Sequence, residues 1–297
     1  MMKPLLGLRA HDFGTLPAEA LAPSIADSGA ACVQLALAKA LPNEPMLPSD
    51  LGESGLAFVS NAFKESELSV VVLGCYIDMV TLNMSEREAA LQRFEAHIEA
   101  APKLGCKIVG TETGSPVPYG TGPDAIEAAF RVSLHSLRRL ITVAEKSGPN
   151  GVKVGLEPVA DIHALSSAEH ARILIEEMNS DALGIIFDPV NLVPQKGIAD
   201  MEAFLDNCFD CFGEHIVALH AKDYRMESGP NGPEKSGPIP AGTGEMDWLG
   251  VFTRLFKAGK QGVPILLEDT GPADAEDTFA CLTKLWLQAA SAEADRV

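Results

Sequence analysis

Four residues that can bind a metal ion or move a proton stand at the ends of four consecutive apolar runs. Glu157 ends the run VGLE, Asp188 ends IIFD, His220 ends VALH and Glu268 ends ILLE. Removing a lone carboxylate from water is costly, so three carboxylates brought together need either protons or a shared cation. A divalent metal ion would remove their mutual repulsion, and the pattern therefore predicts a metal site.

Each of these residues taken alone has a simpler interpretation. A single acidic residue after a strand is typical of a helix N-cap or of the surface, and a single histidine in an apolar run is typical of the core. The metal hypothesis rests on the four residues together. Three oxygen ligands and one imidazole favour one divalent ion, Mn²⁺ first, with Mg²⁺, Co²⁺ and Zn²⁺ also compatible.

The four residues belong to a repeated alternation of short apolar runs with longer stretches of helical periodicity. Most of the runs are apolar throughout, as parallel strands beneath helices are. The expected strands are Leu5–Ala10, Ala31–Ala36, Ser69–Cys75, Lys107–Thr111, Lys153–Glu157, Gly184–Asp188, Ile216–His220 and Pro264–Glu268. The expected helices are Ser85–Leu104 (with Ser85 as its N-cap), Pro123–Ser147, Ser167–Asn179, Met201–Phe212, Asp247–Ala258 and Ala275–Ala289.

Eight β/α units in 297 residues predict an α/β fold, a single (β/α)8 TIM-barrel domain. A doubly wound open sheet is the alternative, but the chain lacks the Gly-rich dinucleotide turn typical of it. We expect residues 227–246 to form a long loop after the seventh strand, a flexible lid that leads to a helix capped by Asp247. The glycines of this loop could also bind phosphate, although the charge of Asp247 disfavours an anion there. Whether the substrate is phosphorylated stays open.

Composition limits the class of partner. The net charge of −18 argues against nucleic acid and anionic membranes, which both need a basic surface. Six cysteines are too sparse for a disulfide framework, and the one CxxC, Cys208–Cys211, falls in a helical stretch. The apolar start is too short for a secretory signal, and the chain has no apolar run of membrane-spanning length. We expect a cytoplasmic protein that acts on a small molecule.

The motifs LEPV, FDPVNL, HAKD and LEDTG, with GTETG at the fourth strand and GTGEMDW after the seventh, resemble those of the sugar phosphate isomerase/epimerase family. These proteins are xylose isomerase-like TIM barrels, related to the ketose 3-epimerases and to the endonuclease IV fold. The resemblance implies that Glu157, Asp188, His220 and Glu268 ligate one metal ion. It also implies that Glu157 and Glu268 face opposite sides of the substrate, where one abstracts a proton and the other returns it. By analogy, a homo-oligomer with a role in carbohydrate metabolism is expected.

Two positions depart from the family pattern. Epimerases of this group usually carry a histidine where this chain has Asn191, and an amide can bind a substrate oxygen but does not titrate. Their arginine after the seventh strand is loosely matched by Arg225. The additional histidines with which endonuclease IV holds three zinc ions are missing, and the acidic charge argues against DNA.

Further polar residues are expected to face the substrate. His11 follows the first strand, Glu112 ends the fourth, His163 lies six residues after Glu157, and Lys222 lies two residues after His220. The alternative is hydrogen bonding within loops and caps for His11 and Glu112, and a salt bridge to a neighbouring carboxylate for Lys222. The remaining histidines fall in helices or at helix ends and are interpreted as non-catalytic: His97, His135, His170 and His215.

These features predict a metal-dependent isomerase or epimerase that moves a proton through an enediolate-like intermediate of a sugar or sugar phosphate. The first alternative is a metal-dependent lyase, such as a dehydratase of a keto-inositol-like polyol, in which proton abstraction leads to loss of water. The second alternative is a non-catalytic barrel that binds a sugar, which predicts no metal at stoichiometric level.

Overall fold

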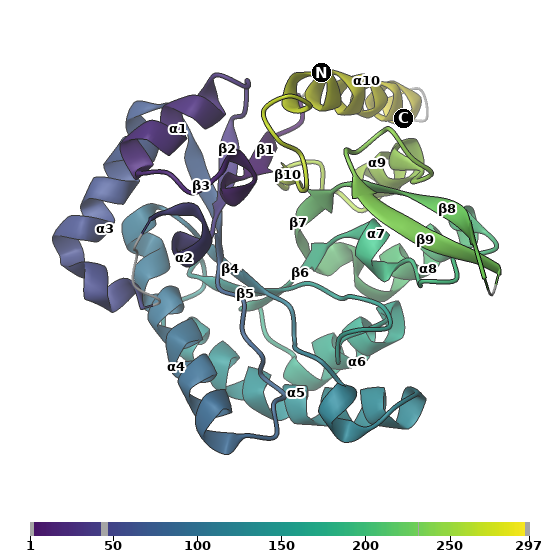
Figure 1. The fold of residues 1–297 in the computed structure, drawn as a ribbon, viewed down its shortest axis with the longest axis horizontal. Coiled ribbons are helices and arrows are strands. Elements are labelled where there is room, and N and C mark those ends of the chain that lie inside the picture. Colours follow the sequence, from purple (N-terminus) through teal and green to yellow (C-terminus); the bar gives the residue numbers. More distant parts are fainter. Residues whose placement is uncertain (1–2, 43–46, 231, 295–297) are drawn as a thin grey trace.

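Eight parallel strands close into a barrel at the centre of the molecule (Figure 1). The computed structural model describes residues 3–42, 47–230 and 232–294. The order around the barrel is β1, β10, β7, β6, β5, β4, β3 and β2. Their bounds are β1 Leu6–Arg9, β2 Cys32–Leu35, β3 Ser69–Gly74, β4 Ile108–Thr111, β5 Lys153–Leu156, β6 Leu183–Phe187, β7 Ile216–Ala221 and β10 Ile265–Leu267. The predicted TIM-barrel fold is confirmed, and each predicted strand is found within a residue at either end.

Helices surround the barrel (Figure 1). They are α1 Ala18–Ala26, α2 Leu37–Ala40, α3 Pro48–Glu65, α4 Met84–Ala100, α5 Pro123–Glu145, α6 Ala168–Met178, α7 Pro189–Leu192, α8 Met201–Phe212, α9 Trp248–Lys257 and α10 Ala275–Ala294. Short 3₁₀ helices are η1 Ala10–Phe13, η2 Ala101–Leu104, η3 Val117–Tyr119 and η4 Gly213–His215. The expected cap at Ser85 is wrong, because Asn83 precedes α4 and its side chain accepts from the backbone N–H of Ser85 and Glu86. An amide oxygen in this position satisfies two donors of the first turn.

The segment after the seventh barrel strand contains a β-hairpin, so the long loop expected at 227–246 is regular structure over most of its length. Strand β8 (Asp223–Gly229) pairs antiparallel with β9 (Gly232–Ile239). The Gly- and Pro-rich sequence of the hairpin concealed these strands, because both residue types are depleted in strands and proline is confined to edges. Only the end of the segment matches its expected role, where Asp247 Oδ1 accepts from the N–H of Gly250 and caps α9.

The structure adds two observations on composition. The six cysteines are free, and the CxxC pair Cys208 and Cys211 lies in α8, as expected. In the described part of the chain, no helix has both the length and the apolar character of a membrane span.

Small residues leave room for one large side chain inside the barrel. Ile186 of β6 is buried and packs in a cluster with Val72, Ile108 and Leu266. A Cβ atom at Gly110 would lie 2.7 Å from Ile186 Cδ1, and one at Gly155 would lie 2.9 Å from it. Ile186 therefore packs against bare backbone and closes the floor of the barrel below the strand end that follows it.

Replacing Ile186 by alanine should destabilise the fold by about 2–5 kcal/mol, because neighbouring strands cannot collapse into the space left behind. Urea unfolding followed by circular dichroism measures the change. The matched control is Ile162→Ala, whose side chain is 61% exposed and whose loss should cost less than about 0.5 kcal/mol. Equal effects of the two substitutions would contradict this role for Ile186.

Candidate metal centre

Four side chains from neighbouring strands meet at the mouth of the barrel. Glu157 follows β5, Asp188 follows β6, His220 lies in β7 and Glu268 follows β10. Their exposed fractions are 4%, 0%, 1% and 3%. Each residue offers one ligand atom, and these atoms all lie within 4.8 Å of one another. The four strands are neighbours in the barrel, so residues that lie far apart in the sequence come close together in space.

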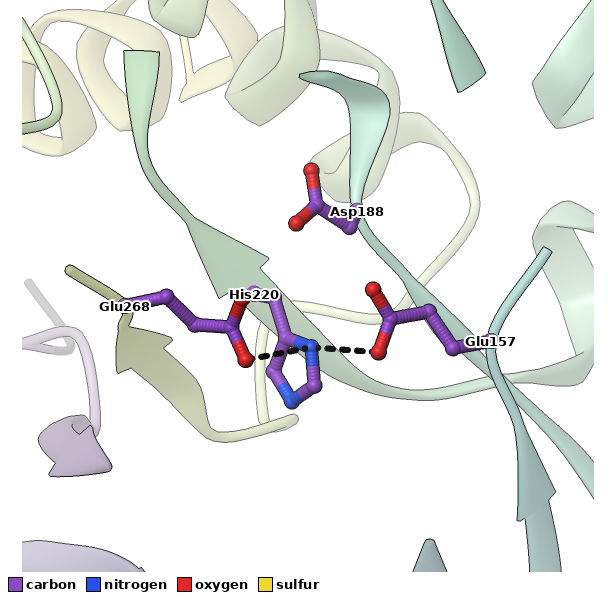
Figure 2. Close-up of side chains that lie close together, drawn as sticks. All are labelled: Glu157, Asp188, His220 and Glu268. Carbon is purple, nitrogen blue, oxygen red and sulfur yellow. Dashed lines mark ion pairs between the residues drawn. The ribbon is translucent and has the colours of Figure 1, made fainter. Parts of the chain in front are cut away.

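The imidazole of His220 lies between two carboxylates (Figure 2). Its Nδ1 atom is 3.0 Å from Glu157 Oε2 and 3.3 Å from Glu268 Oε1. Figure 2 shows Glu157 and Glu268 approaching the ring from opposite sides, with Asp188 above them. A backbone N–H three residues further along the chain orients Asp188: the N–H of Asn191 donates to Asp188 Oδ1 at 2.9 Å.

A glutamine from the far side of the barrel fixes the orientation of this ring. His220 Nε2 lies 2.7 Å from Gln34 Oε1, and Gln34 Nε2 donates to Tyr76 Oη at 2.9 Å. Because an amide oxygen only accepts, this contact favours a proton on Nε2, and a neutral ring would then offer the lone pair of Nδ1 to an ion held among the carboxylates. Sequence reasoning missed Gln34 because it lies inside β2 rather than at a strand end. The signal was one polar residue within the otherwise apolar run CVQL.

Two cations offset the buried negative charge. Lys222 Nζ lies 2.8 Å from Asp188 Oδ2 and 2.9 Å from Glu268 Oε2, and Arg9 Nη1 lies 3.1 Å from Glu268 Oε1. Burial alone would raise the pKa of Glu268, but His220, Lys222 and Arg9 together hold that pKa far below its usual range. The structure thus realises the salt-bridge alternative for Lys222. Arg9 was overlooked, although it too ends a strand.

Two buried atoms of the cluster lack a hydrogen bond of good geometry, Asp188 Oδ2 and His220 Nδ1. Burial raises the pKa of Asp188, and the charge of Lys222 only partly opposes this. Burial lowers the pKa of His220, but the charges of Glu268 and Glu157 outweigh it and raise that pKa to about 9. Both atoms instead face charged groups, Asp188 Oδ2 the ammonium of Lys222 and His220 Nδ1 the two glutamate carboxylates. Three carboxylates and one imidazole nitrogen form a donor set that could bind one divalent cation.

Two of the other expected site residues, Glu112 and Asn191, interact with this cluster. Burial first, and then the charges of Glu157 and Glu268, raise the pKa of Glu112 to about 7. Asn191 Nδ2 donates to Glu157 Oε1. The amide therefore orients a carboxylate of the cluster, whereas the sequence suggested a contact with substrate.

The two remaining histidines of the expected site have different surroundings. His163 Nδ1 accepts from the N–H of Gly114 at 3.0 Å, which ties the loop after β5 to the loop after β4. His11 Nδ1 is buried and without a hydrogen-bond partner, and burial, followed by the charges of Arg9 and Lys39, lowers the pKa of His11 to about 4. A neutral His11 ring is therefore expected at pH 7.

The structure does not bring Arg225 to the cluster. Arg225 is exposed on β8, and its Nη2 donates to the carbonyl of Thr243 at 2.9 Å. The resemblance matched this side chain loosely to an arginine after the seventh strand, but the chain turns out of the barrel into the hairpin at Asp223. The histidines interpreted as non-catalytic lie in α4, α5, α6 and η4, away from the cluster: His97, His135, His170 and His215.

Comparisons with known proteins agree with this architecture. Residues 23–285 match the family model described as xylose isomerase-like TIM barrel, whereas no curated protein matches the sequence. A 3-keto-D-glucoside 4-epimerase from E. coli is 20% identical, with a TM-score of 0.69 over 95% of this chain and 100% of the other. A magnesium complex of a xylose isomerase-like TIM barrel protein from Mycobacterium smegmatis is 17% identical, with a TM-score of 0.72 over 97% and 98% of the chains. A D-psicose 3-epimerase from Clostridium cellulolyticum H10, solved with D-tagatose, is 13% identical, with a TM-score of 0.67 over 98% and 97%. The extent of the family match shows that the chain belongs to the xylose isomerase-like TIM barrels.

Proposed function

We propose that this protein is a metal-dependent sugar isomerase or epimerase, in which Glu157, Asp188, His220 and Glu268 bind one divalent ion. The observation that carries the proposal is the convergence of four buried ligand atoms within 4.8 Å of one another at the barrel mouth. Support comes from the likeness of the fold to two sugar epimerases and to a barrel that binds magnesium. Since these structures share at most 20% identity with the chain, they support the class of reaction and leave the substrate open.

The donor set favours Mn²⁺, and the ion would polarise the carbonyl and hydroxyl oxygens of an open-chain sugar. Glu157 and Glu268 are the proposed proton-transfer pair. Their carboxylates lie on opposite sides of His220 Nδ1, 3.0 and 3.3 Å from it, so both could reach a substrate carbon held beside the ion (Figure 2). One carboxylate, ionised at the start, takes a proton from carbon to give an enediolate-like intermediate, and the other, protonated at the start, delivers its proton to the opposite face.

The neighbours of the two carboxylates hold them in place for this task. Asn191 Nδ2 binds Glu157 Oε1 and leaves Oε2 directed toward the centre. Glu268 is held through both oxygens, by Arg9 at Oε1 and by Lys222 at Oε2. Fixed orientation of the acid and the base contributes to rate because less freedom is lost on the way to the transition state.

Replacing either proposed proton carrier by glutamine should lower turnover by roughly 10²–10⁴-fold, because the amide keeps the shape and cannot accept a proton. The assay incubates the Mn²⁺-loaded protein with a panel of ketoses in D₂O and measures deuterium in the product by mass spectrometry. Wild-type protein should incorporate solvent deuterium at carbon. Glu157→Gln and Glu268→Gln should not, and their metal content is measured in parallel because both residues are proposed ligands.

The matched control is Glu227→Gln, an exposed carboxylate of the hairpin, which should behave as wild type. Full turnover by Glu268→Gln at normal metal content would refute the assignment of Glu268 to the proton-transfer pair. A product lighter than its substrate by one water would identify the protein as a lyase instead. Absence of stoichiometric metal after purification without chelator would favour the non-catalytic barrel.

Gln34→Leu should weaken Mn²⁺ binding by about 10–100-fold, because the hydrogen bond that orients the imidazole of His220 is lost. Calorimetric titration of metal-free protein gives the affinity, and the visible spectrum of the Co²⁺ form reports the geometry of the site. Gln92→Leu serves as the control, since Gln92 is exposed on α4 and bonds only Glu88. Equal Mn²⁺ affinity in wild type and Gln34→Leu would show that Gln34 does not position the ligand.

A further inference from the structure

A second cavity opens beside the cluster, between the β8–β9 hairpin and α7. It measures about 140 Å³, and its walls include Asn191, Lys222, Lys235 and Ser236. A single water needs only about 10–15 Å³ of such volume, so the cavity has room for a group of several heavy atoms. The described residues that line it include no acidic side chain.

The cavity and the candidate metal centre share two walls. Asn191 binds Glu157, and Lys222 lies between Asp188 and Glu268. A small molecule bound at the metal centre by one end could therefore place its other end in this cavity. The cavity belongs to the same mouth of the barrel, but sequence analysis assigned no role to Lys235.

Two ammonium groups reach this cavity, each with unused donor capacity. Lys235 Nζ donates to the carbonyls of Val190 and Val193, at 3.0 and 2.6 Å, where α7 ends. Lys222 Nζ is engaged by two carboxylates. Because an ammonium carries three N–H donors, each lysine keeps one donor beyond these contacts.

The position of Lys235 is electrostatically unfavourable in the absence of an anion. Its side chain is half-buried, and burial first, with a further contribution from the charge of Lys222, lowers the pKa of Lys235 despite the opposing charge of Asp188. A chain with a net charge of −18 has many acidic residues, yet no acidic side chain lines this cavity in the described structure. A negatively charged group of a ligand would pair with the free N–H and compensate the buried charge.

We propose that this cavity binds the anionic end of the substrate, a carboxylate or a phosphate group, with Lys235 as its principal donor. The substrate class is then an acidic open-chain polyol or ketose with its reacting carbons at the metal centre and its charge at the hairpin. The position of the reacting carbons at the metal centre rests on the proposed function. Anion binding at Lys235 does not, because it can be measured independently of turnover.

The test compares three four-carbon ligands by calorimetry on the Mn²⁺-loaded full chain: neutral erythritol, D-erythronate with a carboxylate, and D-erythritol 4-phosphate. At least one anion should bind about tenfold tighter than erythritol or better, as a charge-assisted hydrogen bond provides. The larger gain identifies which anionic group the cavity takes. The gain should vanish in Lys235→Met and in Lys235→Gln, and Lys235→Arg should retain it.

Three controls separate charge from folding. Lys196→Met removes a neighbouring ammonium that pairs with Glu234 of the hairpin and does not line the cavity, so it should keep the gain. Lys235→Gln retains an N–H donor for the carbonyls of α7 and serves if the methionine variant is unstable. Thermal unfolding and Mn²⁺ affinity of each variant show whether the fold and the metal centre are intact.

Equal affinity for the three ligands in the wild type, no binding of any of them, or a gain that survives in both Lys235→Met and Lys235→Gln would overturn the inference. Failure to bind Mn²⁺ would count against the proposed function instead. In that case the metal-free protein is titrated with inorganic phosphate. Binding that depends on Lys235 would still support the anion site, and its absence would refute it.

Discussion

The structure at the barrel mouth depends on one constraint, the placement of three carboxylates in a volume from which water is excluded. Glu157, Asp188 and Glu268 are almost fully buried and share a space of a few ångströms. Such an arrangement is stable only if cations or hydrogen-bond donors surround it. Lys222 and Arg9 supply two of the charges. His220 adds an imidazole nitrogen to the three carboxylates, and the four ligand atoms together form a donor set that could bind a divalent cation.

The barrel supplies the geometry that this constraint requires. Strands β5, β6, β7 and β10 are neighbours in the closed sheet, so residues at corresponding heights on them converge without any contribution from flexible loops. Beneath the cluster, Ile186 packs against Gly155 of the neighbouring strand β5 and Gly110 of β4. Two further polar residues orient members of the cluster. Gln34 contacts the imidazole of His220, and Asn191 binds the carboxylate of Glu157. A rigid scaffold thus holds the reactive groups, and the hairpin above them adds the lysine-lined cavity.

Much of the fold and the centre of the site could be predicted from the sequence, because the signals are local. Buried parallel strands are continuous apolar runs, and a polar residue at the end of such a run stands out, as Glu157 and Glu268 do. The contact between His220 and Gln34 spans 186 positions and leaves no local trace. The hairpin was missed because its glycines and prolines are typical of loops, and Arg225 was misplaced with it. Lys235 acquires its environment only when β9 lies over the end of α7.

Anomalous X-ray diffraction at the manganese absorption edge, from crystals of the Mn²⁺-loaded protein, tests the central claim most directly. One strong peak is expected at the barrel mouth, in contact with Glu157, Asp188, His220 and Glu268. Full metal loading with no anomalous peak between these four side chains, or with the peak elsewhere in the molecule, would contradict it.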